Sequence, residues 1–247
     1  MELTDKIKYR FRGPRALYGI NNLQKFLNSH VCVAGAGGVG SWAIEAMVRT
    51  GIGHITIIDC DTIDESNTNR QLHTLQSTLG QPKAEVLKSR LLDINPDAVI
   101  DTLVTKLNID NIEEIMHKIN ADFYVDAIDD LDAKATFVNW AIKNHRQIIV
   151  SGGAGGKTDP LKVTSGDLAE TQNDKLLARL RYKLRKEYNY PHNGKKMRIP
   201  TVYSTEQGKL SKQVSQETDL PAFGAAVCVT ATVGLNLAAF ILNRIKD

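Results

Sequence analysis

Cysteine is scarce in this chain, which holds three among its 247 residues. Cys32, Cys60 and Cys228 lie far apart and form no CxxC pair, so a zinc site built on paired CxxC motifs is excluded. Three scattered cysteines are typical of a protein kept in a reducing cytoplasm. We expect Cys32 to be a core residue. We expect Cys228 to be inert, because a thiol buried in an apolar helix ionises poorly.

The sequence also lacks a strong net charge, an internal repeat and a low-complexity tract. Its formal charge is +3, with 42% hydrophobic and 24% charged residues, which is ordinary for a soluble globular protein. A charge of this size permits nucleic-acid binding without requiring it. Residues 1–15 are polar and charged, without the apolar run of a signal peptide, so we expect a cytoplasmic protein.

One stretch, from Ala222 to Leu242, is nearly uncharged and about long enough to span a bilayer. It contains Thr230, Thr232 and Asn236 as well as glycine and alanine breaks. A buried amphipathic helix packed on the domain explains these features more simply, so we expect no membrane association.

The most informative stretch is Val31–Gly40, where an apolar strand pattern runs into the motif GxGxxG. A helical pattern follows at 41–49, and a strand, glycine turn and helix in this order are typical of nucleotide binding. Gly35 permits a tight turn, Gly37 lets a phosphate approach the backbone, and Gly40 lets the helix pack near the strand. The helix N-terminus would then attract an anion.

Strand and helix patterns alternate after this motif. Further strands are expected at 54–61, 98–104, 121–126, 147–150 and 200–204, further helices at 20–27, 84–92, 110–119, 133–144 and 174–188, and a loop at 206–218. This alternation predicts an α/β fold, a Rossmann-like and mostly parallel sheet with flanking helices. We expect residues 1–156 to form the nucleotide-binding domain. Residues 157–247 would form a C-terminal extension, with a basic helix and an apolar helix, within the same globule.

Acidic and basic side chains follow the expected strands. Asp59 lies 19 residues after Gly40, where a dinucleotide fold places the acid that binds ribose. A polar loop from Asp61 then brings Arg70, and Lys83 begins the next helix. This pair would meet the phosphates of a triphosphate, whereas a nicotinamide cofactor carries only a pyrophosphate and needs no such pair.

A second acidic turn ends the strand at 121–126. Asp129 or Asp130 could hold a magnesium ion between phosphates. The alternative is a structural role, in which one of these aspartates caps the helix at 133–144. The next strand opens into a second glycine-rich turn at 151–156, which would leave room for a substrate.

Two basic segments have two interpretations each. The helix at 174–188 and the turn at 193–198 carry many lysines and arginines, with Tyr182, Tyr188 and Tyr190 between them. They are either a solvated face or an RNA-binding surface that combines phosphate contacts with stacking. Near the N-terminus, a cluster of arginines is either a solvated arm or a set of guanidinium groups that reach a phosphate: Arg10, Arg12 and Arg15.

Taken together, these motifs resemble those of the ThiF/MoeB superfamily, the adenylyltransferases related to ubiquitin-activating enzymes. The resemblance covers residues 17–156 and lies in GAGGVG, the Asp59/Asp61 pair, SNxxRQ at 66–71, GxPK at 80–83 and DxxD at 126–129. It implies that ATP is bound with magnesium at Asp129, and that Arg70, Lys83 and Asp129 are catalytic. The residues expected to bind the nucleotide are Gly35, Gly37, Gly38, Gly40, Asp59, Asp61, Asn67, Arg70, Gln71, Lys83 and Asp129.

The second half of the chain is similar to one branch of that superfamily, the tRNA-modifying dehydratases. The similar segments include GGAGG at 152–156, DLAxT at 167–171, YSTE at 203–206 and FGAA at 223–226. The implied reaction is ATP-dependent cyclisation of threonylcarbamoyladenosine next to the anticodon of tRNA. The implied assembly is a homodimer, in which Arg12 or Arg15 could reach the partner's site. A cysteine desulfurase or sulfur acceptor remains open as a further partner.

Three alternatives stay open at this point. The first is adenylation of the C-terminus of a small carrier protein, against which the missing CxxC pairs and the basic helix argue. The second is a nicotinamide-dependent oxidoreductase, against which Arg70, Lys83 and Asp129 argue. The third is a tRNA-binding or partner-docking protein without catalytic activity, which would not consume ATP.

Overall fold

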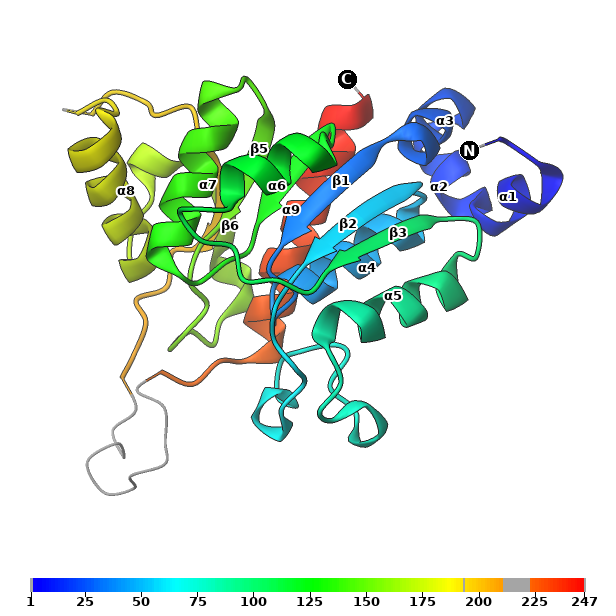
Figure 1. The fold of residues 1–247 in the computed structure, drawn as a ribbon, viewed down its shortest axis with the longest axis horizontal. Helices are drawn as coiled ribbons and strands as arrows, with labels where there is room; N and C mark the ends of the chain where they lie inside the picture. The colour runs from blue at the N-terminus through cyan, green and yellow to red at the C-terminus, as the bar shows by residue number, and fades with distance from the viewer. Residues whose placement is uncertain (1, 193, 211–222, 247) are drawn as a thin grey trace.

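The computed structural model describes residues 2–192, 194–210 and 223–246. These residues form a seven-stranded sheet in the order β3-β2-β1-β4-β5-β7-β6, in which only β6 runs antiparallel to its neighbour (Figure 1). The strands are β1 His30–Ala34, β2 His54–Ile58, β3 Val99–Leu103, β4 Phe123–Asp126, β5 Gln147–Ser151, β6 Val163–Asp167 and β7 Pro200–Ser204. The predicted α/β class is therefore confirmed.

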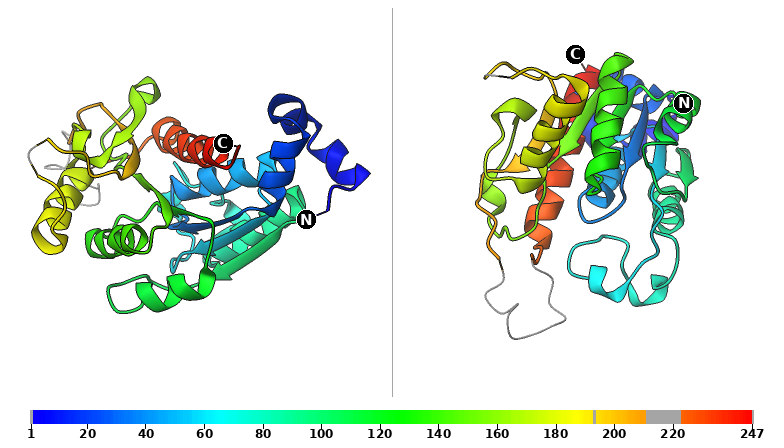
Figure 2. Two further views of the ribbon diagram at one scale, coloured as in Figure 1. Left: turned by 90° about the horizontal axis from the view of Figure 1, so that it is seen from above. Right: turned by 60° about the vertical axis from the view of Figure 1, so that its left-hand side comes forward.

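Helices cover both faces of this sheet, as the view from above in Figure 2 shows. The α-helices are α1 Asp5–Arg10, α2 Arg12–Tyr18, α3 Ile20–Asn28, α4 Gly40–Thr50, α5 Lys83–Ile94, α6 Ile112–Ile119, α7 Leu131–Lys143, α8 Lys175–Tyr188 and α9 Val227–Lys246. One apolar core lies between the sheet and α4, α5 and α9, and a second lies between the sheet and α6, α7 and α8.

The alternation of side chains along β1 explains why two cores form. Val31 and Val33 belong to the core with α4 and α9, whereas Cys32 and Ala34 belong to the core with α7. Successive residues of a strand point to opposite faces, and both faces of a parallel sheet are covered by helices. A continuous apolar run is the result, and Cys32 is fully buried as expected.

Strand β6, Val163–Asp167, is not expected from its sequence. It is half exposed, contains Gly166 and shows no apolar alternation. It forms because it pairs with the buried strand β7, whose own neighbour is β5. Residues after 156 therefore extend the same sheet that carries the glycine motif.

The apolar C-terminal helix α9, Val227–Lys246, packs lengthwise on α4. A Cβ at Gly234 would lie 2.4 Å from the carbonyl oxygen of Val39, so the two backbones approach closely there. The helix is long and apolar enough to cross a membrane, and half of its most apolar window is buried inside the protein. The first residue of the expected stretch, Ala222, and the loop expected at 206–218 from residue 211 on, lie outside the described residues.

One prediction about α9 is wrong. Cys228 is exposed rather than buried. The residue lies in the first turn of the helix beside Val227, which is also exposed, so its side chain is on the solvent side of that turn.

The N-terminal residues form helices rather than an extended arm. Ile7 and Phe11 pack against Leu23 and Leu27 in a small core of their own. Arg10 does not reach a nucleotide site, because its guanidinium contacts Asp97 at 2.5 Å and the amide oxygen of Asn95 at 2.8 Å. Helix α2 lies beside the amino ends of the strands (Figure 1).

Candidate active site

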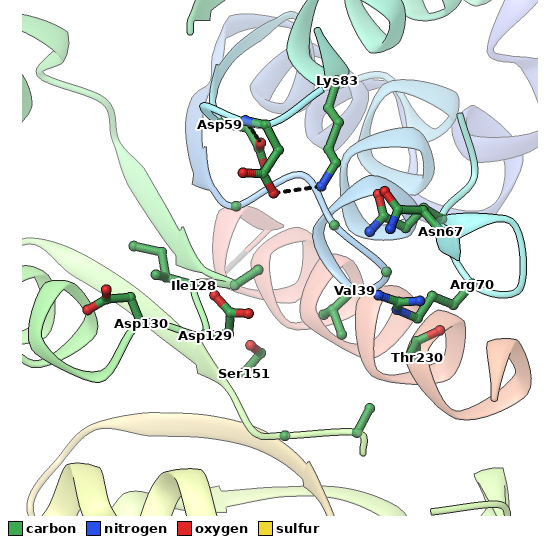
Figure 3. Close-up of a pocket in the computed structure, with 18 of the residues that line it drawn as sticks. Val39, Asp59, Asn67, Arg70, Lys83, Ile128, Asp129, Asp130, Ser151 and Thr230 are labelled. Atoms are coloured by element: carbon green, nitrogen blue, oxygen red, sulfur yellow. Dashed lines mark hydrogen bonds and ion pairs between the residues drawn. The ribbon is translucent and has the colours of Figure 1, made fainter. Parts of the chain in front are cut away.

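A cavity of about 790 Å³ opens at the carboxyl ends of the parallel strands. It lies where the strand order reverses between β1 and β4, the position at which open α/β sheets bind ligands. The segments that follow β1, β2, β4 and β5 line it, together with the starts of α5 and α9 (Figure 3).

The glycine turn after β1 is shaped by two positions where a side chain has no room. Gly35 has φ +92°, and its Cβ would lie 2.6 Å from the carbonyl oxygen of Ala127. A Cβ at Gly40 would lie 1.8 Å from the carbonyl oxygen of Gly35. Gly40 is buried and does not line the cavity, so among the glycines predicted to bind the nucleotide its role is packing.

The turn leaves backbone donors free at the N-terminus of α4. Within the described residues, no hydrogen bond occupies the N–H groups of Gly37, Gly38 or Val39, and Val39 caps the helix without a side-chain bond. Free N–H groups at a helix N-terminus, together with the helix dipole, bind anions such as phosphate.

Asp59 connects the ends of β1 and β2. Its carboxylate accepts hydrogen bonds from the N–H of Ala36 at 2.6 Å and from the N–H of Asp61 at 2.9 Å. Burial raises the pKa of this carboxyl group, while these two bonds and Lys83 oppose the rise. Asp59 therefore fixes the glycine turn at the lining of the cavity.

Lys83 is buried at the first position of α5, with 6% of its side chain exposed. Its ammonium contacts the carboxylate of Asp61 at 2.7 Å, and this bond holds the pKa of Asp61 below its usual range. The pair comes from segments 22 residues apart that meet beneath the cavity. The structure thus fixes the lysine where its charge faces the cavity.

The loop after β2 brings three further polar side chains to the same wall. The guanidinium of Arg70 donates to the side-chain oxygen of Asn69 at 2.8 Å and to the carbonyl of Ser66 at 3.2 Å. The aliphatic part of Arg70 crosses Gly38, where a Cβ would lie 3.0 Å from its Cγ. Asn67 and Gln71 line the cavity beside it, and within the described chain the buried side-chain oxygen of Gln71 has no hydrogen-bond partner.

The acidic turn after β4 assigns separate places to its two aspartates. Asp130 caps α7, because its carboxylate accepts hydrogen bonds from the N–H groups of Asp132 and Ala133. Asp129 lies opposite Arg70 and Lys83 (Figure 3). No hydrogen bond or ion pair to its carboxylate occurs within the described ranges, so this is the carboxylate left for a ligand.

A buried ion pair supports that turn. Lys134 contacts Asp126 at 3.0 Å with both side chains fully buried, and it also donates to the carbonyl of Ile128 at 2.9 Å. The other oxygen of Asp126 accepts from the N–H of Ile128 at 3.1 Å. These bonds fix the backbone immediately before Asp129.

The donors around Asp129 fit magnesium rather than a protein-only metal site. In the part of the chain that the structure describes, no group of three or more His, Cys, Asp or Glu could hold a metal. Magnesium is usually held by one or two carboxylates, water and the phosphates of a substrate. A single free carboxylate facing an arginine, a lysine and free backbone donors fits that pattern.

The glycine-rich turn after β5 is joined to α8 by a second buried ion pair. The carboxylate of Asp174 accepts hydrogen bonds from the N–H of Gly153 at 2.9 Å and from the N–H of Leu177 at 3.0 Å. It therefore fixes the glycine-rich turn and caps α8 at the same time. Lys157 contacts Asp174 at 3.2 Å and donates to the carbonyl of Ser204 at 3.0 Å. The orientation of the basic helix is therefore tied to the floor of the cavity.

The buried side chain of His73, near Lys83, makes the stability of the protein depend on pH. Its ring is 1% exposed, and neither ring nitrogen has a hydrogen-bond partner among the described residues. Burial, with Lys83 as a second cause, lowers the pKa of His73 to about 4 from 6.5. In the unfolded chain, His73 binds a proton below about pH 6.5, whereas in the folded chain it does not do so until about pH 4. The free energy of unfolding therefore falls as the pH falls through this window.

Between pH 7 and pH 4.5, we expect the free energy of unfolding of His73→Leu to fall by about 2 kcal/mol less than that of the wild type. At pH 7 the variant should be at least as stable as wild type, because no buried hydrogen bond is lost. Urea unfolding of both proteins at the two pH values measures the difference. An equal loss in both proteins would show that His73 does not titrate as described.

The structure brings together ten of the eleven residues that the sequence predicted to bind the nucleotide: Gly35, Gly37, Gly38, Asp59, Asp61, Asn67, Arg70, Gln71, Lys83 and Asp129. Ser151 also lines the cavity, in the turn that was expected to leave room for a substrate, whereas Lys106 and Thr230 were missed. Lys106 follows β3, so its place at the carboxyl end of a strand was the available signal. Thr230 gave no signal beyond being polar within an apolar helix.

Comparison with known proteins places this geometry in a family. The model of the ThiF family matches residues 12–219. A tRNA threonylcarbamoyladenosine dehydratase of Escherichia coli (strain K12) is 38% identical over 98% of this chain and 95% of its own length. A protein of the same name from Bacillus subtilis (strain 168) is 36% identical over 80% of this chain and 75% of its own.

Solved structures agree with this relationship over nearly the whole chain. The E. coli tRNA N6-threonylcarbamoyladenosine dehydratase, TcdA, in complex with AMP superposes with a TM-score of 0.93 at 37% identity, covering 99% of this chain and 97% of the other. The same E. coli enzyme in complex with ATP gives a TM-score of 0.92 at the same identity and coverage. The chain belongs to the ThiF family.

Proposed function

We propose that this protein uses ATP to dehydrate threonylcarbamoyladenosine in tRNA, next to the anticodon, and so closes a ring on the modified base. The observation that carries the proposal is the cavity itself. Its one wall offers free backbone N–H groups, Arg70 and Lys83 to phosphates. Its other wall, the glycine-rich turn at 151–155, leaves room for a substrate.

In the proposed first step, the threonyl carboxylate attacks the α-phosphate of ATP, which gives an acyl adenylate and pyrophosphate. A carboxylate oxygen is a poor leaving group. Transfer of AMP from ATP onto that oxygen turns it into a good one. Arg70 and Lys83 would stabilise the charge that develops as pyrophosphate leaves. Asp59 would bind the ribose and orient the nucleotide. Attack at the γ-phosphate, which would give an acyl phosphate, is the variant of this step.

In the second step, a nitrogen or the oxygen of the neighbouring carbamoyl group attacks the activated carbonyl carbon. AMP leaves with one oxygen of the carboxylate, the attacking group loses a proton, and the ring closes. Both reacting groups belong to the same substituent, so the reaction needs positioning more than covalent assistance. The glycine-rich turn, fixed by Asp174, is the element that would hold the substituent in place.

Magnesium would bind at Asp129 and neutralise phosphate charge. We extend the proposal to a cytoplasmic homodimer, in which the exposed Arg12 or Arg15 reaches the cavity of the partner. Helix α2 lies beside the amino ends of the strands, so these residues do not reach the cavity of their own chain (Figure 1). A cysteine desulfurase or sulfur acceptor would be a further partner, and residues 1–156 and 157–247 would act as one unit.

Nucleoside mass spectrometry tests the proposed reaction. Threonylcarbamoyl-modified tRNA is incubated with the protein and magnesium, with and without ATP, then digested to nucleosides. We expect the modified nucleoside to lose one water only when ATP is present. An unchanged nucleoside with sound controls would favour the alternative of activating a carrier protein, which pyrophosphate exchange with a carrier would then test.

We predict that no thioester forms on this chain, because the group that attacks the activated carbonyl belongs to the substrate itself. Cys60 lines the cavity, but burial and the neighbouring Asp61 raise the pKa of its thiol, so little thiolate is present at neutral pH. We expect a Cys60→Ser/Cys228→Ser double variant to retain dehydration within about threefold of wild type, since surface changes of this kind alter energies by roughly 0.5 kcal/mol. A folded but inactive double variant would restore a covalent cysteine mechanism.

A further inference from the structure

We propose that a groove between α7 and α8 is the subsite for a nucleotide next to the modified adenosine, with its base stacked on Tyr182 and its phosphate held by Arg179 and Lys186. This inference rests on the proposed function. It adds to that function the place at which the RNA strand leaves the active site. The groove has a volume of about 390 Å³. It is lined by Leu131, Asp132, Ala178, Arg179, Tyr182, Lys183, Lys186 and Glu187.

The groove continues the active-site cavity along both of its helices. In the turn before α7, Asp129 and the cap residue Asp130 line the cavity, and the first two residues of the helix, Leu131 and Asp132, line the groove. On α8, Leu176 lines the cavity, and the groove begins two residues later. A strand whose reacting nucleotide lies in the cavity can therefore pass directly into the groove. The two helices lie side by side in Figures 1 and 2.

Tyr182 is suited to stacking because its ring is open to solvent. Tyr182 is 66% exposed. The ammonium of Lys186 lies 5.8 Å from the centre of its ring. An exposed aromatic ring beside a cation is the arrangement with which proteins hold single-stranded bases.

The charges around the groove fit a phosphate. Lys183 is already neutralised by Asp132 at 2.8 Å and Glu187 at 2.8 Å, so it forms the floor of the groove. Arg179 and Lys186 are exposed, and no acidic group in the described chain lies within ion-pair distance of either. Two unneutralised cations beside an exposed ring favour RNA over an apolar peptide, which would leave both charges without a partner.

The binding constant of threonylcarbamoyl-modified tRNA tests this subsite without requiring turnover. We expect Tyr182→Ala to weaken tRNA binding by about 5- to 150-fold, the range of one lost stacking contact. Tyr182→Phe keeps the ring and should bind as the wild type does. Arg179→Ala and Lys186→Ala should each reduce the slope of log binding constant against log salt by about one. Lys143→Ala, an exposed lysine at the far end of α7, is the charge-matched control and should change neither quantity.

Two further readouts separate the subsite from damage to the active site. Affinity for ATP should be unchanged in Tyr182→Ala, and so should the dehydration rate with the isolated modified nucleoside, which has no neighbouring nucleotide. Unchanged tRNA binding in Tyr182→Ala, or no tRNA binding by the wild-type protein, would overturn the subsite. A wild-type protein that binds tRNA but does not dehydrate it would contradict the proposed function alone, and the stacking measurement would still decide the subsite.

Discussion

Replacing Arg70 with alanine is expected to lower the turnover of ATP-dependent dehydration by about 10²- to 10³-fold, the usual effect of removing one group that stabilises transition-state charge. The guanidinium is held by Asn69 and the carbonyl of Ser66 above the free N–H groups of the glycine turn. In the proposed adenylation it would therefore face the place where pyrophosphate charge develops. The rate is measured by nucleoside mass spectrometry at saturating tRNA and ATP.

Stability provides the control for this variant. The hydrogen bonds that the Arg70 guanidinium makes to described residues are exposed, so we expect Arg70→Ala to change the free energy of unfolding by roughly 0.5 kcal/mol or less. Arg70→Lys keeps the charge but not the planar geometry and should recover part of the rate. A wild-type rate in Arg70→Ala would remove this residue from the catalytic site.

Replacing Lys134 with methionine is expected to destabilise the protein by about 3–5 kcal/mol, because Asp126 would remain as a buried charge without a partner. Lys134 and Asp126 are both fully buried, and the lysine also holds the carbonyl of Ile128. The turn that carries Asp129 would loosen together with the core. Urea unfolding at pH 7 measures the loss.

A double variant separates the unpaired charge from lost packing. Asp126→Asn keeps an oxygen for the N–H of Ile128, and together with Lys134→Met it leaves no buried charge. We expect this double variant to be more stable than Lys134→Met alone, since removing both charges of a buried pair costs less than removing one. If the double variant is the less stable of the two, the ion pair is not the cause of the loss.

The sequence predicted much of the site because simple rules govern where such residues gather. A glycine turn between a buried strand and a helix points to a phosphate site. Residues that follow parallel strands meet at one edge of the sheet, so Asp59, Arg70 and Asp129 were expected to lie near one another. Lys83 was placed by the same rule, because the loop after β2 returns to that edge before its helix begins.

Other features depend on tertiary contacts that leave no local pattern. Strand β6 is polar and half exposed, and it exists only because β7 pairs with it. Lys134 appears in the sequence as an ordinary charged residue of a helix, and its burial depends on Asp126 in another element. Cys228 was predicted to be buried from its apolar neighbours, but its side chain lies on the exposed side of the first turn of α9.

We propose that a carboxylate oxygen of the substrate leaves on the α-phosphorus of ATP. The most direct test uses modified tRNA in which the threonyl carboxylate carries oxygen-18, followed by mass spectrometry of the products. We expect one labelled oxygen in AMP and one in the cyclised nucleoside. Label recovered in inorganic phosphate or in water, with none in AMP, would contradict attack at the α-phosphate.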